Sequence, residues 1–190
     1  VKRSRGVSKR LDDGVGFLMK KNKIQIIWGE AAIDAPGKIT VKPSKTEAPK
    51  GAAGPGQYQA KHIIIATGSR VAQLPGVKVD GERVVTSTEA LSFGAVPEHL
   101  VVIGGGYIGL EMSSIWRRLG AKVTVLEYLD HILPGIDGEV GAEAFKIFKK
   151  QGIEFRLGTK VTSAKAQGKK CIVECEGAAP ITCDRVLMSV

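Results

Sequence analysis

The chain has 190 residues, 43% of them hydrophobic, and a formal net charge of +9 at pH 7. This size allows one sizeable domain or two small ones. No apolar run is long enough to span a membrane, so we expect a globular protein without a membrane partner. The positive charge would suit a nucleic-acid-binding protein, but the lysines are scattered and lack interleaved aromatic residues, so we expect no nucleic-acid partner.

We expect no secretory signal in the first residues, because the basic opening lacks an apolar core. Residues 11–23 have the pattern of the end of an amphipathic helix, and residues 24–28 predict a strand. The chain therefore begins within a predicted helix, and it ends inside the apolar run 186–190. We expect it to be a segment of a longer protein.

A further strand is predicted over residues 38–42, followed by a long exposed hairpin loop over 43–56 that is rich in Pro, Gly, Lys and Ala. The uninterrupted β-branched run at 62–66 predicts a buried parallel strand, and small residues follow it. A linker over 70–83 then leads to a short helix, for which Thr86 and Glu89 offer a capping box.

The most informative stretch is residues 99–127, in which a strand, a glycine-rich turn, a helix and a second strand follow one another. Gly104, Gly106 and Gly109 fit the pattern G-x-G-x-x-G in one frame only. The first glycine permits a tight turn, the second lets backbone amides approach a pyrophosphate, and the third lets the helix lie close to the strand. The phosphates would bind at the N-terminus of the helix.

The surroundings of this turn match those of a dinucleotide-binding unit. Four residues form the predicted apolar face of the helix: Ile108, Met112, Ile115 and Leu119. Gly120 is the candidate C-cap, and the second strand, over 122–126, ends at Glu127. An acid about 20 residues beyond the glycines is expected to bind the adenosine ribose. We therefore predict dinucleotide binding, in preference to a purely structural βαβ unit.

The remaining residues predict a second helix, a third strand over 153–157, a meander of short strands over 159–181 and a final strand from Arg185. The apolar face predicted for that helix comprises Val140, Ala144, Ile147 and Phe148. The fold class is therefore α/β, with a Rossmann-type parallel βαβ sheet and an antiparallel β-meander.

The cysteines and histidines do not predict a metal site. Cys171, Cys175 and Cys183 match neither C-x-x-C nor a zinc-binding spacing with any histidine. We expect reduced, half-buried cysteines in strands, and histidines at the surface or in loops.

Taken together, several segments resemble the flavoprotein disulfide reductases, and in particular the branch that oxidises dihydrolipoyl groups. They are GVGFLMKKNKI (14–24), IIIATGSR (63–70), VVIGGGYIGLE (101–111), WRRLGAKVTVLE (116–127) and the segment 129–162. The resemblance implies that residues 1–69 are the latter portion of an FAD-binding α/β domain. Residues 70–190 would be an NAD-binding Rossmann-type domain that lacks its C-terminal end.

The resemblance also implies site residues. FAD would lie beside Ala31, Thr67, Gly68 and Ser69. NAD would be held by Gly104, Gly105, Gly106, Tyr107, Ile108, Gly109, Leu110 and Glu111, with Glu127 on the adenosine ribose and Val161 against the adenine. The redox cysteine pair and the catalytic His and Glu of the family would lie outside these 190 residues, so we expect no catalytic residue here and no turnover by the chain alone.

The implied reaction passes two electrons from the dihydrolipoyl group of a 2-oxo acid dehydrogenase complex, through an enzyme disulfide and FAD, to NAD. The longer protein would be a homodimer of the bacterial cytoplasm or the mitochondrial matrix. Two alternatives stay open. One is another disulfide reductase, of the glutathione or mercuric type, although Glu127 disfavours those that use NADP. The other is a non-catalytic module that binds dinucleotides or nucleic acid.

Overall fold

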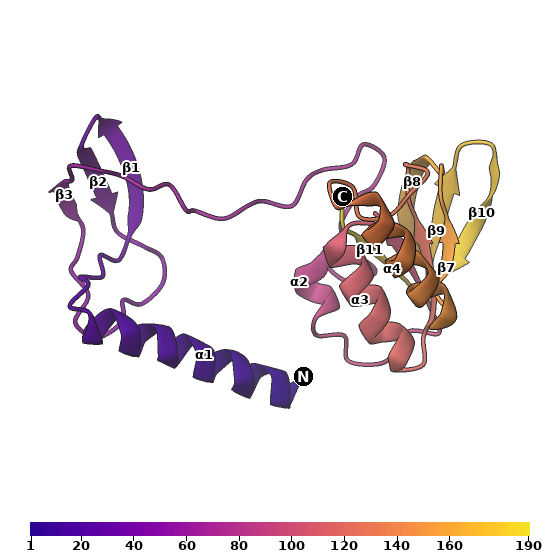
Figure 1. Ribbon diagram of the computed structural model, residues 1–190, viewed down its shortest axis with the longest axis horizontal. Helices are drawn as coiled ribbons and strands as arrows, with labels where there is room; N and C mark the ends of the chain where they lie inside the picture. Colours follow the sequence, from indigo (N-terminus) through magenta and orange to yellow (C-terminus); the bar gives the residue numbers. More distant parts are fainter. The chain divides into compact units, whose positions relative to one another are not determined.

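A computed structural model describes all 190 residues, which divide into two units, Val1–Gly68 and Ser69–Val190. The division lies one residue before the domain boundary predicted from the sequence. Each unit has its own sheet or sheets, so the two are described separately (Figure 1). None of the helices in either unit is both long enough and apolar enough to cross a membrane.

The first unit consists of a long helix and a small antiparallel sheet. Helix α1 (Lys2–Lys21) is followed by β1 (Glu30–Ala35), β2 (Lys38–Lys42) and β3 (Gly56–Gln59), in the order β1-β2-β3. The predicted strand at 38–42 and the hairpin loop after it are confirmed. Helix α1 has no buried residue, and Val41 is the only buried hydrophobic residue of this unit.

Two strands predicted in this unit are wrong. Residues 24–28 form only an isolated parallel bridge, between Ile27 and Ala53. Residues 62–66 form no strand, and Ile64 and Ile65 are 90% and 72% exposed. A strand needs a neighbour for its backbone groups, and neither run is paired along a partner strand in this unit, so β propensity alone does not produce one.

The second unit is built on a five-stranded parallel sheet in the order β4-β11-β5-β6-β7. Its strands are β4 (Val84–Val85), β5 (His99–Ile103), β6 (Lys122–Leu126), β7 (Glu154–Arg156) and β11 (Arg185–Met188). Its helices are α2 (Ser87–Ala90), α3 (Tyr107–Arg118) and α4 (Gly138–Lys150). The predicted strands, the three helices and the complete capping box at α2 are confirmed.

Both faces of the parallel sheet are covered, which explains the uninterrupted apolar run of β5. Leu100 and Val102 point to the helices, in a cluster that includes Trp116 of α3. Val101 and Ile103 point to the antiparallel meander β8 (Val161–Gln167), β9 (Lys170–Cys175) and β10 (Ala178–Cys183). The unit therefore has three layers, with the helices and the meander on opposite sides of the sheet (Figure 1).

The predicted apolar face of α3 is largely wrong. Met112 is buried, but Ile108, Ile115 and Leu119 are 36%, 44% and 56% exposed. The buried residues of the helix are Gly109, Leu110, Met112, Ser113 and Trp116. The third glycine of the turn must lie against the strand, and this requirement rotates the helix so that the residues 3, 4 and 7 positions beyond it face the sheet. Gly120, just beyond the helix, has a positive φ of 108°, as expected for a glycine that ends it.

In α4, Ala144 and Phe148 are half-buried as predicted, whereas Val140 and Ile147 are exposed. Phe145 takes their place, with its ring centroid 4.9 Å from that of Phe155 in β7. The helix therefore faces the sheet with a different set of residues, because its aromatic side chains reach the edge strand.

The cysteines are free, but all three are buried rather than half-buried. Alternation along β9 and β10 points them into the cluster between the meander and the sheet. One histidine also departs from expectation, because His99 lies in β5 and is half-buried, with its Nε2 2.9 Å from Thr124 Oγ1.

Candidate dinucleotide site

The turn after β5 requires glycine at two positions for reasons internal to the protein. Gly104 has a φ of 110°, and a Cβ there would lie 2.5 Å from the carbonyl oxygen of Ser189. A Cβ at Gly109 would lie 2.3 Å from the carbonyl oxygen of Gly104. Both distances are far below van der Waals contact, so these glycines allow strand, turn and helix to pack closely.

The glycine between them has a different role. A Cβ on Gly106 would meet nothing within 4 Å, so the protein itself does not require a glycine there. Gly106 is the N-cap of α3 and has no side-chain capping bond. The first N–H groups of a helix have no partner within it, and they carry the positive end of the helix dipole. The open space in front of them suits an anionic group such as a pyrophosphate.

Glu127 lies at the carboxyl end of β6, and its side chain folds back onto the glycine turn. The residue is only 8% exposed. Its Oε2 accepts a hydrogen bond from the Gly105 N–H at 2.6 Å, and its Oε1 accepts one from the Leu129 N–H at 2.8 Å. Each carboxylate oxygen keeps a second lone pair. The acid is therefore held in one orientation and can still accept hydrogen bonds from a ligand.

The sequence indicates the position of Glu127 after the glycines, but it did not predict that the carboxylate also accepts hydrogen bonds from the backbone. Val161 lies at the same pocket as Glu127, and its contact with an adenine stays a prediction. Both line a pocket of about 120 Å³, together with Gly104, Tyr128 and Lys160. An acid and an apolar side chain at one pocket match the two halves of an adenosine, its ribose and its base.

A larger pocket of about 640 Å³ lies on the other side of the turn. Gly106, Tyr107 and Ile108 line it, and Tyr107 is 70% exposed. Ser189, which follows β11, also lines it and donates a hydrogen bond from its Oγ to the Ile103 carbonyl at 3.1 Å. The sequence analysis did not single out Ser189, although a small polar residue at the end of a parallel strand is the signal that would have found it.

The other residues implied by the resemblance, with the exception of Ser69, do not line these two pockets. Leu110 is 2% exposed and packs in the interior, and Glu111 is exposed on α3. Among the residues expected near FAD, Ala31 is exposed in β1, and Thr67 and Gly68 follow the unpaired run 62–66. Ser69 belongs to the second unit and lines the larger pocket near the turn. The FAD assignment of these four residues stays a prediction.

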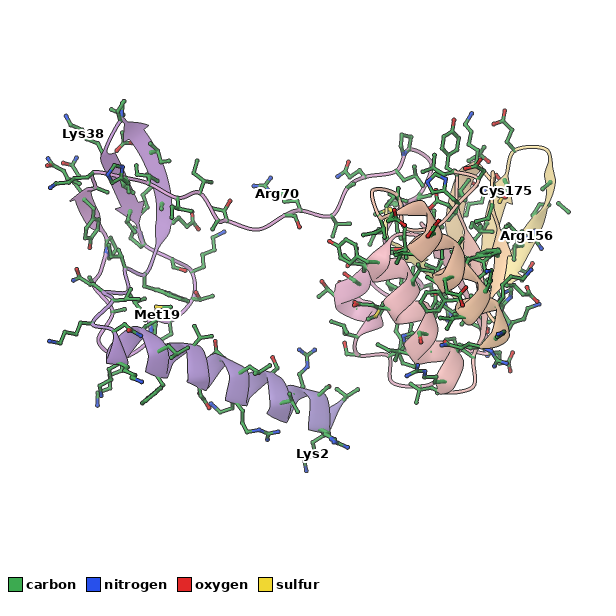
Figure 2. The ribbon with its side chains drawn as sticks, in the orientation of Figure 1. Lys2, Met19, Lys38, Arg70, Arg156 and Cys175 are labelled. Atoms are coloured by element: carbon green, nitrogen blue, oxygen red, sulfur yellow. The ribbon has the colours of Figure 1, made fainter.

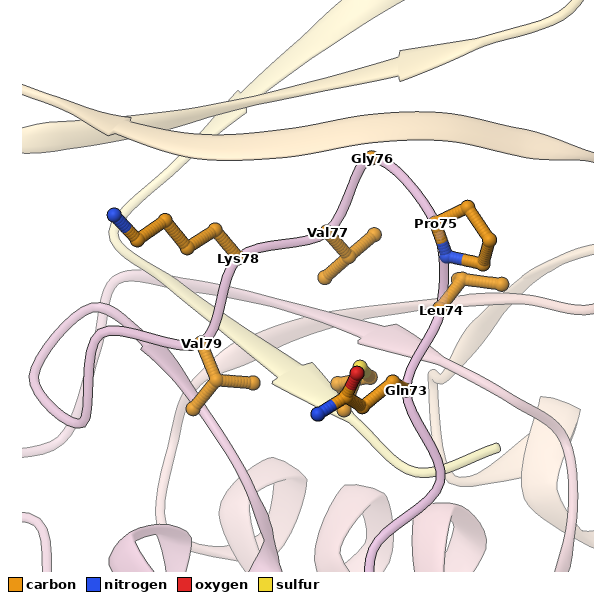
Figure 3. A pocket seen from close by; sticks show the side chains of 8 residues that line it. Gln73, Leu74, Pro75, Gly76, Val77, Lys78 and Val79 are labelled. Atoms are coloured by element: carbon orange, nitrogen blue, oxygen red, sulfur yellow. The ribbon is translucent and has the colours of Figure 1, made fainter.

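The linker predicted at 70–83 is docked on the meander by its turn. A third pocket, of about 680 Å³, lies against this segment (Figure 3). Gly76 sits at the tip of the turn, where a Cβ would be 1.9 Å from the Thr162 carbonyl oxygen, and its own carbonyl accepts from the Ala164 N–H at 3.2 Å. This pocket contains none of the residues expected to bind a nucleotide, so we do not assign it to the dinucleotide site.

Known proteins resemble this chain over nearly its whole length. Residues 2–190 match the family described as pyridine nucleotide-disulphide oxidoreductase. The chain is 45% identical over 201 aligned residues to a dihydrolipoyl dehydrogenase of Rhizobium etli, covering all of this chain and 42% of that protein. It is 47% identical over 169 residues to dihydrolipoyl dehydrogenase 3 of Pseudomonas putida, covering 89% of this chain and 35% of that one. The chain therefore spans less than half the length of these relatives.

Solved structures show the same fold. LpdA from Mycobacterium tuberculosis superposes with a TM-score of 0.82 at 24% identity, covering 99% of this chain and 41% of that one. The HOCl-induced flavoprotein disulfide reductase RclA of Escherichia coli superposes with a TM-score of 0.68 at 28% identity, covering 95% of this chain and 41% of that one. With the family match over nearly its whole length, the chain belongs to the pyridine nucleotide-disulphide oxidoreductase family.

Proposed function

We propose that the unit Ser69–Val190 binds NAD, and that the chain is the NAD-binding portion and part of the FAD-binding portion of a dihydrolipoyl dehydrogenase. One observation carries the first part. Gly106, at the start of α3, has open space where a side chain would lie, and the neighbouring turn holds the carboxylate of Glu127 in a fixed orientation. The second part is supported by relatives of that name at 42% to 47% identity.

In this proposal each element has one task. The N–H groups that begin α3 bind the pyrophosphate, Glu127 accepts from the adenosine ribose, and Val161 packs against the adenine. The pocket beside Tyr107 and Ser189 would take the nicotinamide half. NAD, when bound, supplies the ring that accepts a hydride. The residues of this unit therefore bind and orient the electron acceptor.

The wider assignment extends the same proposal to the longer protein. Ala31, Thr67, Gly68 and Ser69 would contribute to an FAD site completed by further segments, and the electrons would come from the dihydrolipoyl group of a 2-oxo acid dehydrogenase complex. A homodimer in the bacterial cytoplasm or the mitochondrial matrix would be the working form. Relatives with "mitochondrial" in their names, such as one from Caenorhabditis elegans at 42% identity, are compatible with the second location.

The test is calorimetric titration of the chain with NAD and with NADP. A 2′-phosphate would meet the negative charge of Glu127 and displace a ribose hydrogen bond, a difference of about 2 to 4 kcal/mol, or roughly 30-fold to 1000-fold in affinity. Glu127→Gln should weaken NAD binding and narrow this preference. Equal affinities of the unmodified chain for the two nucleotides would overturn the assignment.

A matched control removes one carboxylate charge elsewhere. Glu47 is exposed in the loop between β2 and β3, in the other unit. Glu47→Gln changes the net charge by the same amount as Glu127→Gln and should leave both affinities unchanged. A similar loss of NAD binding in both variants would show that net charge, rather than the position of Glu127, controls binding.

A further inference from the structure

A second carboxylate lies near the pocket that contains Glu127, because it forms an ion pair with a lysine that lines this pocket. Lys160 lines that pocket with Glu127, Tyr128 and Val161, and it is the only basic residue that does so. Its Nζ lies 2.9 Å from Oε2 of Glu176, which is in the turn between β9 and β10. The two residues are also joined through the backbone, since the Glu176 N–H donates to the Lys160 carbonyl at 2.9 Å.

This double connection keeps the ammonium group of Lys160 close to the carboxylate of Glu176. The backbone hydrogen bond holds the chain before β8 against the turn after β9, so the carboxylate of Glu176 is always within reach of the ammonium group. The ion pair with Glu176 raises the pKa of Lys160 above its ordinary value. The lysine is thus charged at neutral pH, and its charge is balanced before any ligand arrives.

We propose that Glu176 is a specificity-determining residue for the nucleotide, which acts by holding Lys160. The pocket lined by Glu127, Val161 and Lys160, here called the adenosine pocket, then presents an acid and no free cation to the ribose 2′ position. The inference rests on the proposed binding of NAD. A phosphate monoester carries a charge of about −1.5 to −2 at pH 7, and a lysine on its flexible stem is a common phosphate ligand. A free Lys160 would offset the repulsion from Glu127 and admit NADP.

The competing explanation is that the pair is a solvated surface contact without effect on ligands. Its side chains are 58% and 63% exposed, and exposed pairs contribute little to stability. That weakness favours the proposal in one respect, because removing Glu176 should free the lysine without unfolding the protein. The two explanations therefore differ in ligand selectivity rather than in stability.

The test uses the adenosine halves of the two cofactors as probes, 5′-AMP and 2′,5′-ADP, titrated into the chain at low ionic strength. Glu176→Gln should raise the affinity for 2′,5′-ADP by about 1.5-fold to fivefold, the size expected for one exposed charge interaction, and leave the affinity for 5′-AMP unchanged. Adding Lys160→Met to Glu176→Gln should abolish the gain. An unchanged 5′-AMP affinity also shows that the variant is folded.

The matched control is Glu143→Gln. Glu143 pairs with Lys146 at 3.1 Å on α4, with similarly exposed side chains, and neither lines the adenosine pocket. A gain for 2′,5′-ADP in this control equal to that in Glu176→Gln would assign the effect to net charge and overturn the inference. No gain in Glu176→Gln, with 5′-AMP still bound, would overturn it while leaving NAD binding intact. If the unmodified chain binds neither 5′-AMP nor NAD, the proposed function fails and the inference fails with it.

Discussion

The three glycines of the turn make separable contributions, because two are required by the protein and one is free for a ligand. Gly109→Ala places a Cβ 2.3 Å from a carbonyl oxygen, and overpacking of this kind costs about 1 to 3 kcal/mol. Gly106→Ala has open space and a φ of −74°, so its cost to folding should stay within the few tenths to about 2 kcal/mol of a changed helix cap.

We therefore predict opposite profiles for these two substitutions. Gly109→Ala should lower the free energy of unfolding in urea, whereas Gly106→Ala should leave most of it and reduce NAD affinity, because its methyl group would occupy the space in front of α3. Urea unfolding and NAD titration of both variants check this. If Gly106→Ala binds NAD as tightly as the unmodified chain does, the pyrophosphate does not bind at this position.

At the level of elements, a chain of polar side chains joins β5, β6 and β7. His99 Nε2 lies 2.9 Å from Thr124 Oγ1, and that hydroxyl donates to Glu154 Oε2 at 3.0 Å. Burial and the charge of Lys122 lower the pKa of His99 below its ordinary value of 6.5, although Glu154 and Asp184 act in the opposite direction. The folded protein therefore disfavours protonation of this imidazole relative to the unfolded chain.

The pKa shift of His99 predicts how stability depends on pH. Because the folded state binds the proton less tightly than the unfolded state, the contribution of His99 is fully present above about pH 6.5 and is lost as the pH falls through the lower folded-state pKa. The free energy of unfolding should decrease between pH 7.5 and 5.5, and His99→Gln should flatten this slope. Parallel slopes for the two proteins in urea titrations would contradict the prediction.

Helix α2 is only four residues long, and its capping box holds its start. The Thr86 N–H donates to Glu89 Oε2 at 2.9 Å, and the helix end is tied to the core because Trp116 Nε1 donates to the Ala90 carbonyl at 3.1 Å. Thr86→Ala should lower the free energy of unfolding by about 1 kcal/mol, and Thr86→Ser should restore most of the loss. Equal stability of the Ala and Ser variants by urea unfolding would show that the cap contributes nothing.

These elements also show what the sequence could predict and why the rest could not be predicted. The capping box at Thr86 and four strands of the parallel sheet, β5, β6, β7 and β11, depend on local patterns, and they are confirmed. The exposed run at 62–66 fails because pairing requires a partner strand, which no local pattern supplies. The face of α3 fails because the contact at Gly109 sets the rotation of the helix. At the site, Glu127 followed from spacing, but its hydrogen bonds to the turn did not.

At the scale of the whole molecule, the buried hydrophobic residues are distributed very unequally. Val41 is the only one in Val1–Gly68, and all the others lie between Val84 and Met188. The side chains of the first unit project outward, whereas those of the second crowd into its interior (Figure 2). Burial of apolar surface is the main favourable contribution to folding, so the second unit holds nearly all the stabilising core.

This distribution predicts two levels of protection in native-state hydrogen exchange. Amides of β5, β6 and β11 should exchange only through global unfolding of the second unit, because they lie between two covered faces of the parallel sheet. Amides of β1, β2 and β3 are hydrogen-bonded but have almost no buried apolar side chains beneath them, so they should exchange through local openings at much lower free energy.

A separate protein comprising Ser69–Val190 should then keep the exchange rates of β5 and its NAD affinity, because both hydrophobic clusters and the glycine turn lie within it. Equal protection of the two units in the full chain would contradict the predicted difference in stability. Loss of protection in β5 after residues 1–68 are removed would show that the first unit stabilises the second.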